Sequence, residues 1–186
     1  MSSKQLSKSR RTLLLVLAAF IIPVVLAKFA LDQQWFNKGV TNKGTLLTNQ
    51  ITLDKMGLSA DSFEKKWLML YLLPEQCQQQ CQQTLHSVNN TYIALGKESE
   101  RVQPIALTHQ DLTVSQRQLI KEKSWAIQSM PAQTSALFKD SQILIVDTLG
   151  NIILTYIPPK KESAQPLFGK AILADLKKLL KYSKIG

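Results

Sequence analysis

Residues 66–81 read KWLMLYLLPEQCQQQC, and this stretch decides the fold. Its first part, residues 67–73, is a continuous apolar run with two aromatic side chains, which is typical of a strand buried on both faces of a sheet. Pro74 ends the strand, and the polar residues 75–83 that follow are good helix formers. The sequence therefore predicts a buried strand that leads into the first turn of a helix, with Cys77 and Cys81 at the junction.

The two cysteines are candidates for redox or metal chemistry. At about 100° per residue their sulfurs would share one face of the helix, about one turn apart. Free N–H groups and the positive end of the dipole at a helix N-terminus favour a thiolate, the form that exchanges disulfides and binds metals. A structural disulfide and an inert remnant of a lost function are the alternatives, although a loop with so few intervening residues would stabilise the fold only weakly.

Residues 12–31 are predicted to form a transmembrane helix, because they are apolar apart from Thr12 and Lys28. A helix over residues 13–31 would be about 28 Å long, close to a hydrocarbon core of about 30 Å. Residues 1–11 are basic, so the positive-inside rule predicts a cytoplasmic tail and a single pass through a bacterial inner membrane into the periplasm. A cleaved signal peptide is the alternative, since residues 25–27 read VLA. Both interpretations place the remaining chain outside the cytoplasm, where disulfides persist.

The net charge of +10 lies at the two ends of the chain. Residues 1–28 hold five basic and no acidic side chains, residues 158–186 hold seven lysines against Glu162 and Asp175, and the middle is balanced. A neutral body argues against a nucleic-acid groove and predicts contact with a lipid bilayer at the ends. The length predicts one domain, residues 45–186, joined to the membrane by a tether, residues 32–44.

Helices and strands are predicted to alternate through that domain. Residues 45–57 predict one or two short strands and a turn. The expected elements after the cysteines are a helix ending at Gly96, a strand over 103–108, a helix over 114–122 capped by Thr113, a short strand over 125–128, a loop around Pro131, a hairpin with strands 142–147 and 152–157, and an amphipathic helix over 167–180. This order is that of an α/β, thioredoxin-like fold, a central sheet flanked by helices.

Several segments together resemble one family. They are the single N-terminal span, residues 66–71 before a Cys-x-x-x-Cys, VQPIALT at 102–108 and IVDTLGN at 145–151. The sequence resembles the Sco family of membrane-anchored thioredoxin-fold proteins, which help to assemble the copper centre of cytochrome c oxidase. The three residues between the cysteines separate it from ordinary thioredoxins, which have two.

Copper binding by this family uses a histidine shortly before the hairpin, and the sequence has Lys139 there. His109 is the candidate replacement, because it follows the second strand and the carboxyl ends of parallel strands share one rim. Two thiolates and an imidazole suit copper(I), so Cys77, Cys81 and His109 are the candidate copper ligands. His109 could instead tune the pKa of the cysteines or have no role. His86 should point away from the cysteine face, about 140° around the helix from Cys81.

The resemblance predicts an assembly factor for cytochrome c oxidase that acts by thiol–disulfide exchange or copper handling. By analogy with thioredoxin-like helices, Cys77 would be the attacking thiolate and Cys81 the resolving thiol. The expected partner is the copper-bearing oxidase subunit or another assembly factor. A non-catalytic thioredoxin-like interaction protein and a general periplasmic thiol–disulfide reductase are the alternatives. The sequence has no phosphate loop, nucleophile elbow or zinc spacing that would indicate another enzyme class.

Overall fold

The computed structural model describes residues 3–32, 42–47, 49–109, 112–121 and 125–183, and the chain divides into two units, residues 1–41 and 42–186. The first unit contains the helix α1 (Ser3–Asp32), which includes the basic residues predicted as a separate tail. Its segment Arg10–Ala30 has a mean hydropathy of 2.7 and is long and apolar enough to cross a membrane. Of the predicted tether, residues 33–41 lie outside the described residues.

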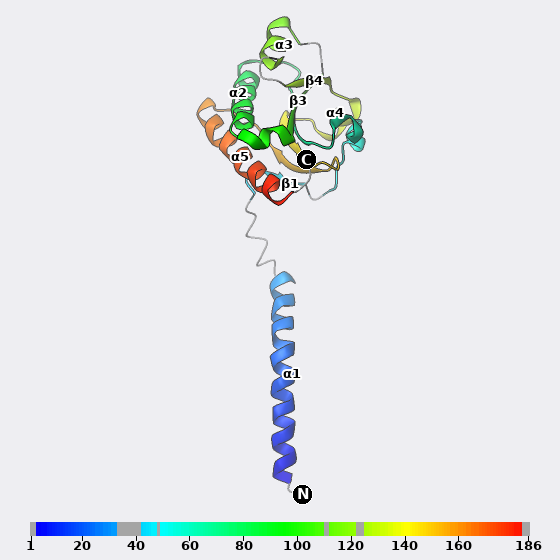
Figure 1. Ribbon diagram of the computed structural model, residues 1–186, viewed down its shortest axis with the longest axis vertical. Helices are drawn as coiled ribbons and strands as arrows, with labels where there is room; N and C mark the ends of the chain where they lie inside the picture. The colour runs from blue at the N-terminus through cyan, green and yellow to red at the C-terminus, as the bar shows by residue number, and fades with distance from the viewer. Residues whose placement is uncertain (1–2, 33–41, 48, 110–111, 122–124, 184–186) are drawn as a thin grey trace. The chain divides into compact units, whose positions relative to one another are not determined.

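The second unit is built on a six-stranded sheet (Figure 1). Its strands are β1 (Thr45–Leu46), β2 (Trp67–Leu72), β3 (Val102–Thr108), β4 (Ala126–Ser129), β5 (Gln142–Val146) and β6 (Ile152–Tyr156). Its α-helices are α2 (Gln79–Ile93), α3 (Val114–Lys121), α4 (Ala132–Leu137) and α5 (Gln165–Tyr182). Short 3-10 helices are η2 (Asp54–Met56), η3 (Ala60–Phe63), η4 (Gly96–Arg101) and η5 (Glu162–Ala164).

Strand β2 lies at the centre of the sheet, whose order is β1-β6-β5-β2-β3-β4. It pairs in parallel with β3 and antiparallel with β5, and all six of its residues are buried. The β-hairpin of β5 and β6 and the closing helix α5 occur where the sequence predicts them. The predicted thioredoxin-like α/β fold is therefore confirmed, including a strand that is buried on both faces.

Each face of the sheet carries its own hydrophobic layer because side chains alternate along β2. Trp67, Met69 and Tyr71 pack with residues of α2 and α5. Leu68 and Leu70 point to the other face and pack with the core residues of η2 and η3. Figure 1 shows α2 and α5 side by side on one flank of the sheet and α4 on the other. The strand that leads to the cysteines is thus fixed from both sides.

Helix α4 is the clearest difference from the sequence prediction, which placed a loop around Pro131. The segment forms six helical residues that begin directly after Pro131. Its Thr134 is fully buried, and the Thr134 Oγ1 donates a 2.7 Å hydrogen bond to the carbonyl of Met56 in η2. The helix is stabilised by this long-range contact, whereas its short sequence, in which three of six residues are polar, has no helical periodicity of its own.

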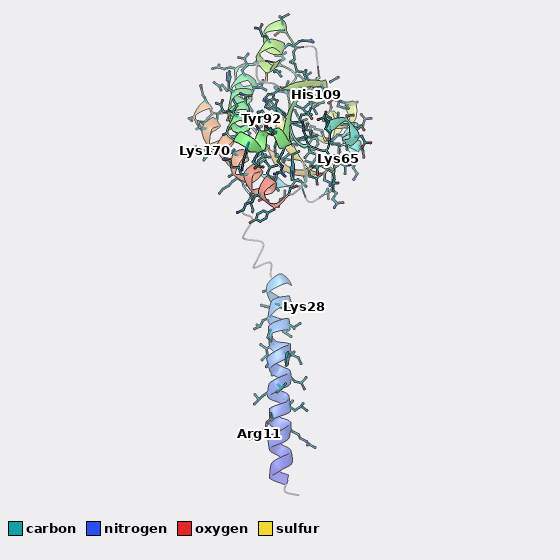
Figure 2. The ribbon with its side chains drawn as sticks, viewed as in Figure 1. Arg11, Lys28, Lys65, Tyr92, His109 and Lys170 are labelled. Carbon is teal, nitrogen blue, oxygen red and sulfur yellow. A yellow bond between two sulfur atoms is a disulfide. The ribbon has the colours of Figure 1, made fainter. Side chains whose placement is uncertain are left out.

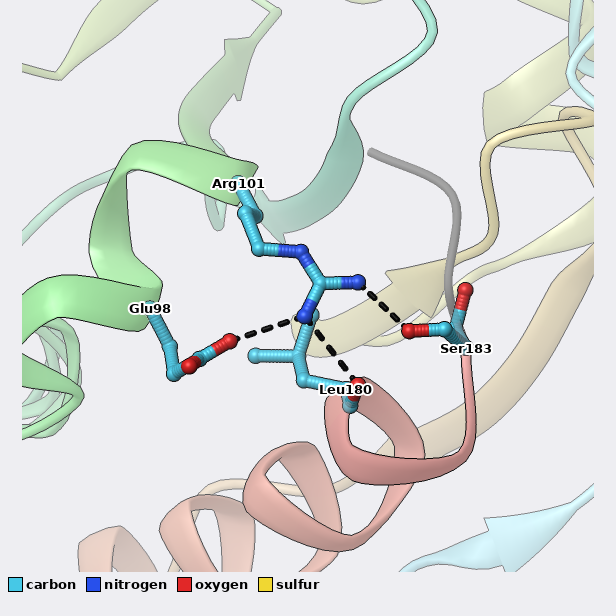
Figure 3. Close-up of polar contacts among 4 residues, drawn as sticks. All are labelled: Glu98, Arg101, Leu180 and Ser183. Atoms are coloured by element: carbon cyan, nitrogen blue, oxygen red, sulfur yellow. Dashed lines mark hydrogen bonds and ion pairs between the residues drawn. The ribbon is translucent and has the colours of Figure 1, made fainter.

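Arg101 joins η4 to the last turn of α5 (Figure 3). The Arg101 guanidinium donates to the carbonyls of Leu180 and Ser183, at 3.1 and 2.7 Å, and lies 2.8 Å from the Glu98 carboxylate. It thereby satisfies carbonyl groups that a helix C-terminus leaves without intrahelical partners.

We expect Arg101→Met to lower the free energy of unfolding by about 1–2 kcal/mol, because the stem is kept while the charged hydrogen bonds are lost. Denaturant unfolding of the full chain in detergent, followed by tryptophan fluorescence, measures this. Lys66→Met is the matched control, since it removes one exposed ion pair with Glu64 and should cost less than about 0.5 kcal/mol. Equal losses in the two variants would contradict this role of Arg101.

Candidate active site

The two cysteines lie at the carboxyl end of β2 and form a disulfide. Only Cys81 belongs to α2, in its first turn. Cys77 precedes the helix, because Pro74 ends the strand and the extended backbone of Gln78 (φ −84°, ψ −167°) delays the first helical residue to Gln79. The prediction that both cysteines lie on one helical face is therefore wrong for Cys77, although the loop brings the two sulfurs together.

The two sulfurs differ in their access to solvent. Cys81 is only 3% exposed and belongs to the core layer beneath α2 and α5. Cys77 is half-buried and borders a hollow of ≈ 250 Å³. Around this hollow lie residues of the strand-to-helix loop together with Thr108, Leu112, Thr113 and Gln116. A visiting thiol would therefore reach the sulfur of Cys77 first.

Gln116 fixes the loop that carries Cys77. Its side-chain Nε2 donates a 3.1 Å hydrogen bond to the carbonyl of Cys77. Its Oε1 accepts from the backbone N–H of Thr113 at 3.0 Å, and Thr113 Oγ1 accepts from the N–H of Gln116 at 3.3 Å. This reciprocal pair is a capping box at the start of α3, and it confirms the predicted cap at Thr113. The sequence analysis missed Gln116, although the Thr-x-x-Gln spacing could have revealed it.

A buried hydroxyl lies on the helix-covered side of β2, below the cysteine loop. Burial raises the pKa of Tyr71 above its usual value, and hydrogen bonds with Ser141 and Thr84 lower it in part. Tyr71 therefore stays neutral at physiological pH, and its place in the core layer under α2 and α5 gives it a packing role.

The histidines lie apart from the hollow beside Cys77. His109 is exposed after β3 (Figure 2), and its Nδ1 is 3.4 Å from Ser135 Oγ. It borders a second hollow of ≈ 460 Å³ together with Glu75 and Lys139, the residue at the position of the expected family histidine. His86 is exposed on α2 and lines a groove between α2 and α5.

The described residues do not form a three-ligand copper site. Nowhere in that part of the chain do three or more His, Cys, Asp or Glu side chains gather closely enough to hold a metal ion. The two sulfurs are bonded to each other, and His109 faces a different hollow. The ligand set of Cys77, Cys81 and His109 stays a sequence prediction.

A copper(I) titration of the reduced chain tests that ligand set. Because His109 lies with Ser135 and Lys139, we expect His109→Ala to leave stoichiometry and affinity unchanged within about twofold. Cys77→Ser, which removes a soft ligand, is the positive control and should weaken binding. A tenfold or greater loss in His109→Ala, about 1.4 kcal/mol, would make the imidazole a third ligand.

The family model described as the C-terminal domain of transmembrane-like, thioredoxin-like proteins matches residues 67–183. The match covers more than half of the chain and includes β2, both cysteines and α5. The chain belongs to the transmembrane-like, thioredoxin-like family. The N-terminal helix, which is apolar and long enough to span a membrane, agrees with that description.

The chain is similar to several solved structures. Apo Sco1 from Thermus thermophilus has a TM-score of 0.54 at 19% identity, covering 74% of this chain and 96% of that one. The thioredoxin domain of a thiol-disulfide oxidoreductase from Bacteroides vulgatus has a TM-score of 0.48 at 14% identity, covering 74% and 96%. A thiol:disulfide interchange protein from Bacteroides sp. has a TM-score of 0.48 at 15% identity, covering 76% and 91%. No curated protein matches the sequence.

Proposed function

We propose that this protein is a membrane-anchored thiol–disulfide exchange factor whose reactive pair is Cys77 and Cys81. The observation that carries the proposal is the unequal exposure of the pair. The half-buried Cys77 borders a hollow. Cys81, which is bonded to it, is buried in the first turn of α2. Such an arrangement lets a partner sulfur bond to the first cysteine while the second displaces it.

In the reducing direction, the Cys77 thiolate attacks one sulfur of a client disulfide, and the other client sulfur leaves as a thiolate. Cys81 then loses its proton and attacks the Cys77 sulfur, which releases the second client thiolate and forms the Cys77–Cys81 disulfide. Two electrons pass to the client, and a dithiol protein must return the pair to its reduced form. The N-terminal turn of α2 favours the thiolate form of Cys81 during this step.

The narrower proposal is that the client is a copper-binding subunit of cytochrome c oxidase or another factor in its assembly. The resemblance of residues 66–71, 102–108 and 145–151 to the Sco family supports it, as does the three-residue spacing of the cysteines. In this proposal α1 lies in a bacterial inner membrane with its basic end in the cytoplasm, and the exchange domain faces the periplasm. A disulfide can persist in that compartment.

The reduction potential of the Cys77–Cys81 pair tests the exchange chemistry. We expect a reduction potential of about −200 mV, typical of exchanging pairs, when the full chain is equilibrated with glutathione buffers. Mass spectrometry after alkylation measures the reduced fraction, and Cys81→Ser is the control that cannot form the internal bond. A potential below about −300 mV would indicate a locked structural disulfide and would contradict the proposal.

A further inference from the structure

Three exposed lysines lie in a row along the outward side of α5. Positions 170, 174, 177 and 181 are four, three and four residues apart, so they lie above one another on the helix, and all four are exposed. Three are lysines and position 174 is alanine. We call Lys170, Lys177 and Lys181 the lysine stripe. Figure 2 shows Lys170 projecting outward from α5.

No acidic side chain of α5 neutralises this stripe. The helix has one acidic residue, Asp175, which is 2% exposed and accepts hydrogen bonds on its buried side from Gly44 and Tyr156. Near the end of the helix, the Glu98 carboxylate lies against Arg101. The stripe therefore presents its positive charge to the surroundings.

The end of the lysine stripe also carries an exposed aromatic ring. Tyr182 is 75% exposed, and Lys181 Nζ lies 5.9 Å from the centroid of its ring. Tyrosine beside lysine is a combination favoured where protein meets a membrane surface, since the ring is apolar at one end and polar at the other. An exposed tyrosine also distinguishes this patch from a purely solvated charged face.

The chain enters the second unit against the same helix. Asn42 is held by Lys178, whose Nζ lies 3.4 Å from Asn42 Oδ1, and the next two backbone N–H groups donate to Asp175. Only residues 33–41 separate Asn42 from α1, and nine residues reach about 30 Å at most. The segment that α1 would place in a bilayer is therefore joined to Asn42 by only nine residues.

We propose that the lysine stripe and Tyr182 bind the anionic phospholipid surface of the bilayer that α1 spans. The partner is recognised by its negative headgroups, which attract each lysine near the surface, and by an interface that accepts the tyrosine ring. This proposal does not depend on the disulfide chemistry. It concerns how the domain is held on the membrane.

Lysine acylation of the full chain in lipid nanodiscs tests this contact. Discs of phosphatidylcholine alone are compared with discs that also contain phosphatidylglycerol, and mass spectrometry measures the acylation rate of each lysine. We expect Lys170, Lys177 and Lys181 each to react about fivefold more slowly in the anionic discs, a factor matching the attraction of one lysine to such a surface. The protection should disappear in about 1 M NaCl, where the Debye length is about 3 Å.

Lys55, which lies on η2, and Lys139, which borders the second hollow with His109, are the internal controls and should react equally in both discs. The variant K177E/K181E changes only exposed side chains, so it should fold normally, and Lys170 should lose its protection in it. Equal rates for the lysine stripe in both kinds of disc would overturn the proposal. Protection seen only in native membranes, and not in anionic discs, would also overturn it by indicating an acidic protein partner.

Discussion

Cys81→Ser is expected to trap the client of this protein in a stable mixed disulfide. In this variant Cys77 can still attack a client disulfide from its half-buried position, but no buried thiol remains to release the client. Turnover should therefore be abolished while a covalent complex accumulates. Non-reducing electrophoresis of membranes that contain the tagged variant, followed by mass spectrometry of the complex, measures both results.

Cys77→Ser is the matched control, because the remaining Cys81 is 3% exposed and covered by the core layer. It should lose turnover equally but form little or no complex. Complexes of equal amount in the two variants would contradict the assignment of Cys77 as the attacking sulfur. If Cys81→Ser traps an oxidase subunit or assembly factor, the narrower Sco-like role is supported, whereas many unrelated periplasmic clients would favour a general reductase.

Local sequence signals were sufficient for most of the fold. The apolar run of β2, the hairpin of β5 and β6 and the periodic α5 each have a pattern that matches their burial, so their positions could be predicted. The capping of α3 by Thr113 could also be predicted from the sequence, since it depends on residues three positions apart. The approach of the two cysteines follows from their spacing in either a helix or a tight loop.

Contacts between residues distant in sequence account for what could not be predicted. Helix α4 depends on Thr134 bonding to Met56, and the Cys77 loop is held by Gln116 from another helix. The separation of His109 from the cysteine hollow depends on how the segment after β3 packs, which strand order alone does not specify. The role of Asp175 as a buried hydrogen-bond acceptor could not be predicted either, because a single aspartate in an amphipathic helix has the sequence pattern of a surface residue.

Asp175→Ala is expected to cause the largest loss of stability of any single change outside the hydrophobic core. The buried Asp175 carboxylate accepts hydrogen bonds from the backbone N–H groups of Lys43 and Gly44, at 2.6 and 2.8 Å, and from Tyr156 Oη at 2.7 Å. Alanine would leave the Gly44 and Tyr156 donors buried without this acceptor and would free the start of the domain from α5. We expect the free energy of unfolding to fall by about 3 kcal/mol or more.

Denaturant unfolding of the full chain in detergent measures this loss, with the buried Trp67 and Trp125 as fluorescent probes. Asp175→Asn is the shape-matched control and should cost less, because its amide oxygen still accepts. Gly44 cannot be replaced to test the same contact, since a Cβ there would collide with the Tyr156 ring. A loss below about 1 kcal/mol in Asp175→Ala would show that the carboxylate is not the link between α5 and residues 43–44.

Tyr156→Phe isolates the hydroxyl part of this link and predicts its pH dependence. Burial raises the pKa of Tyr156 well above its usual value, and the Asp175 carboxylate raises it further. Since the folded-state pKa is raised, the stabilisation is fully present below the unfolded-state value of about 10 and is lost as the pH rises above it.

The free energy of unfolding of the wild-type chain should therefore exceed that of Tyr156→Phe by about 1–2 kcal/mol at neutral pH, and the difference should shrink above about pH 10. Tyr71 titrates in both proteins, so its contribution cancels, and a difference that stays constant through that range would contradict the Tyr156–Asp175 bond as its source.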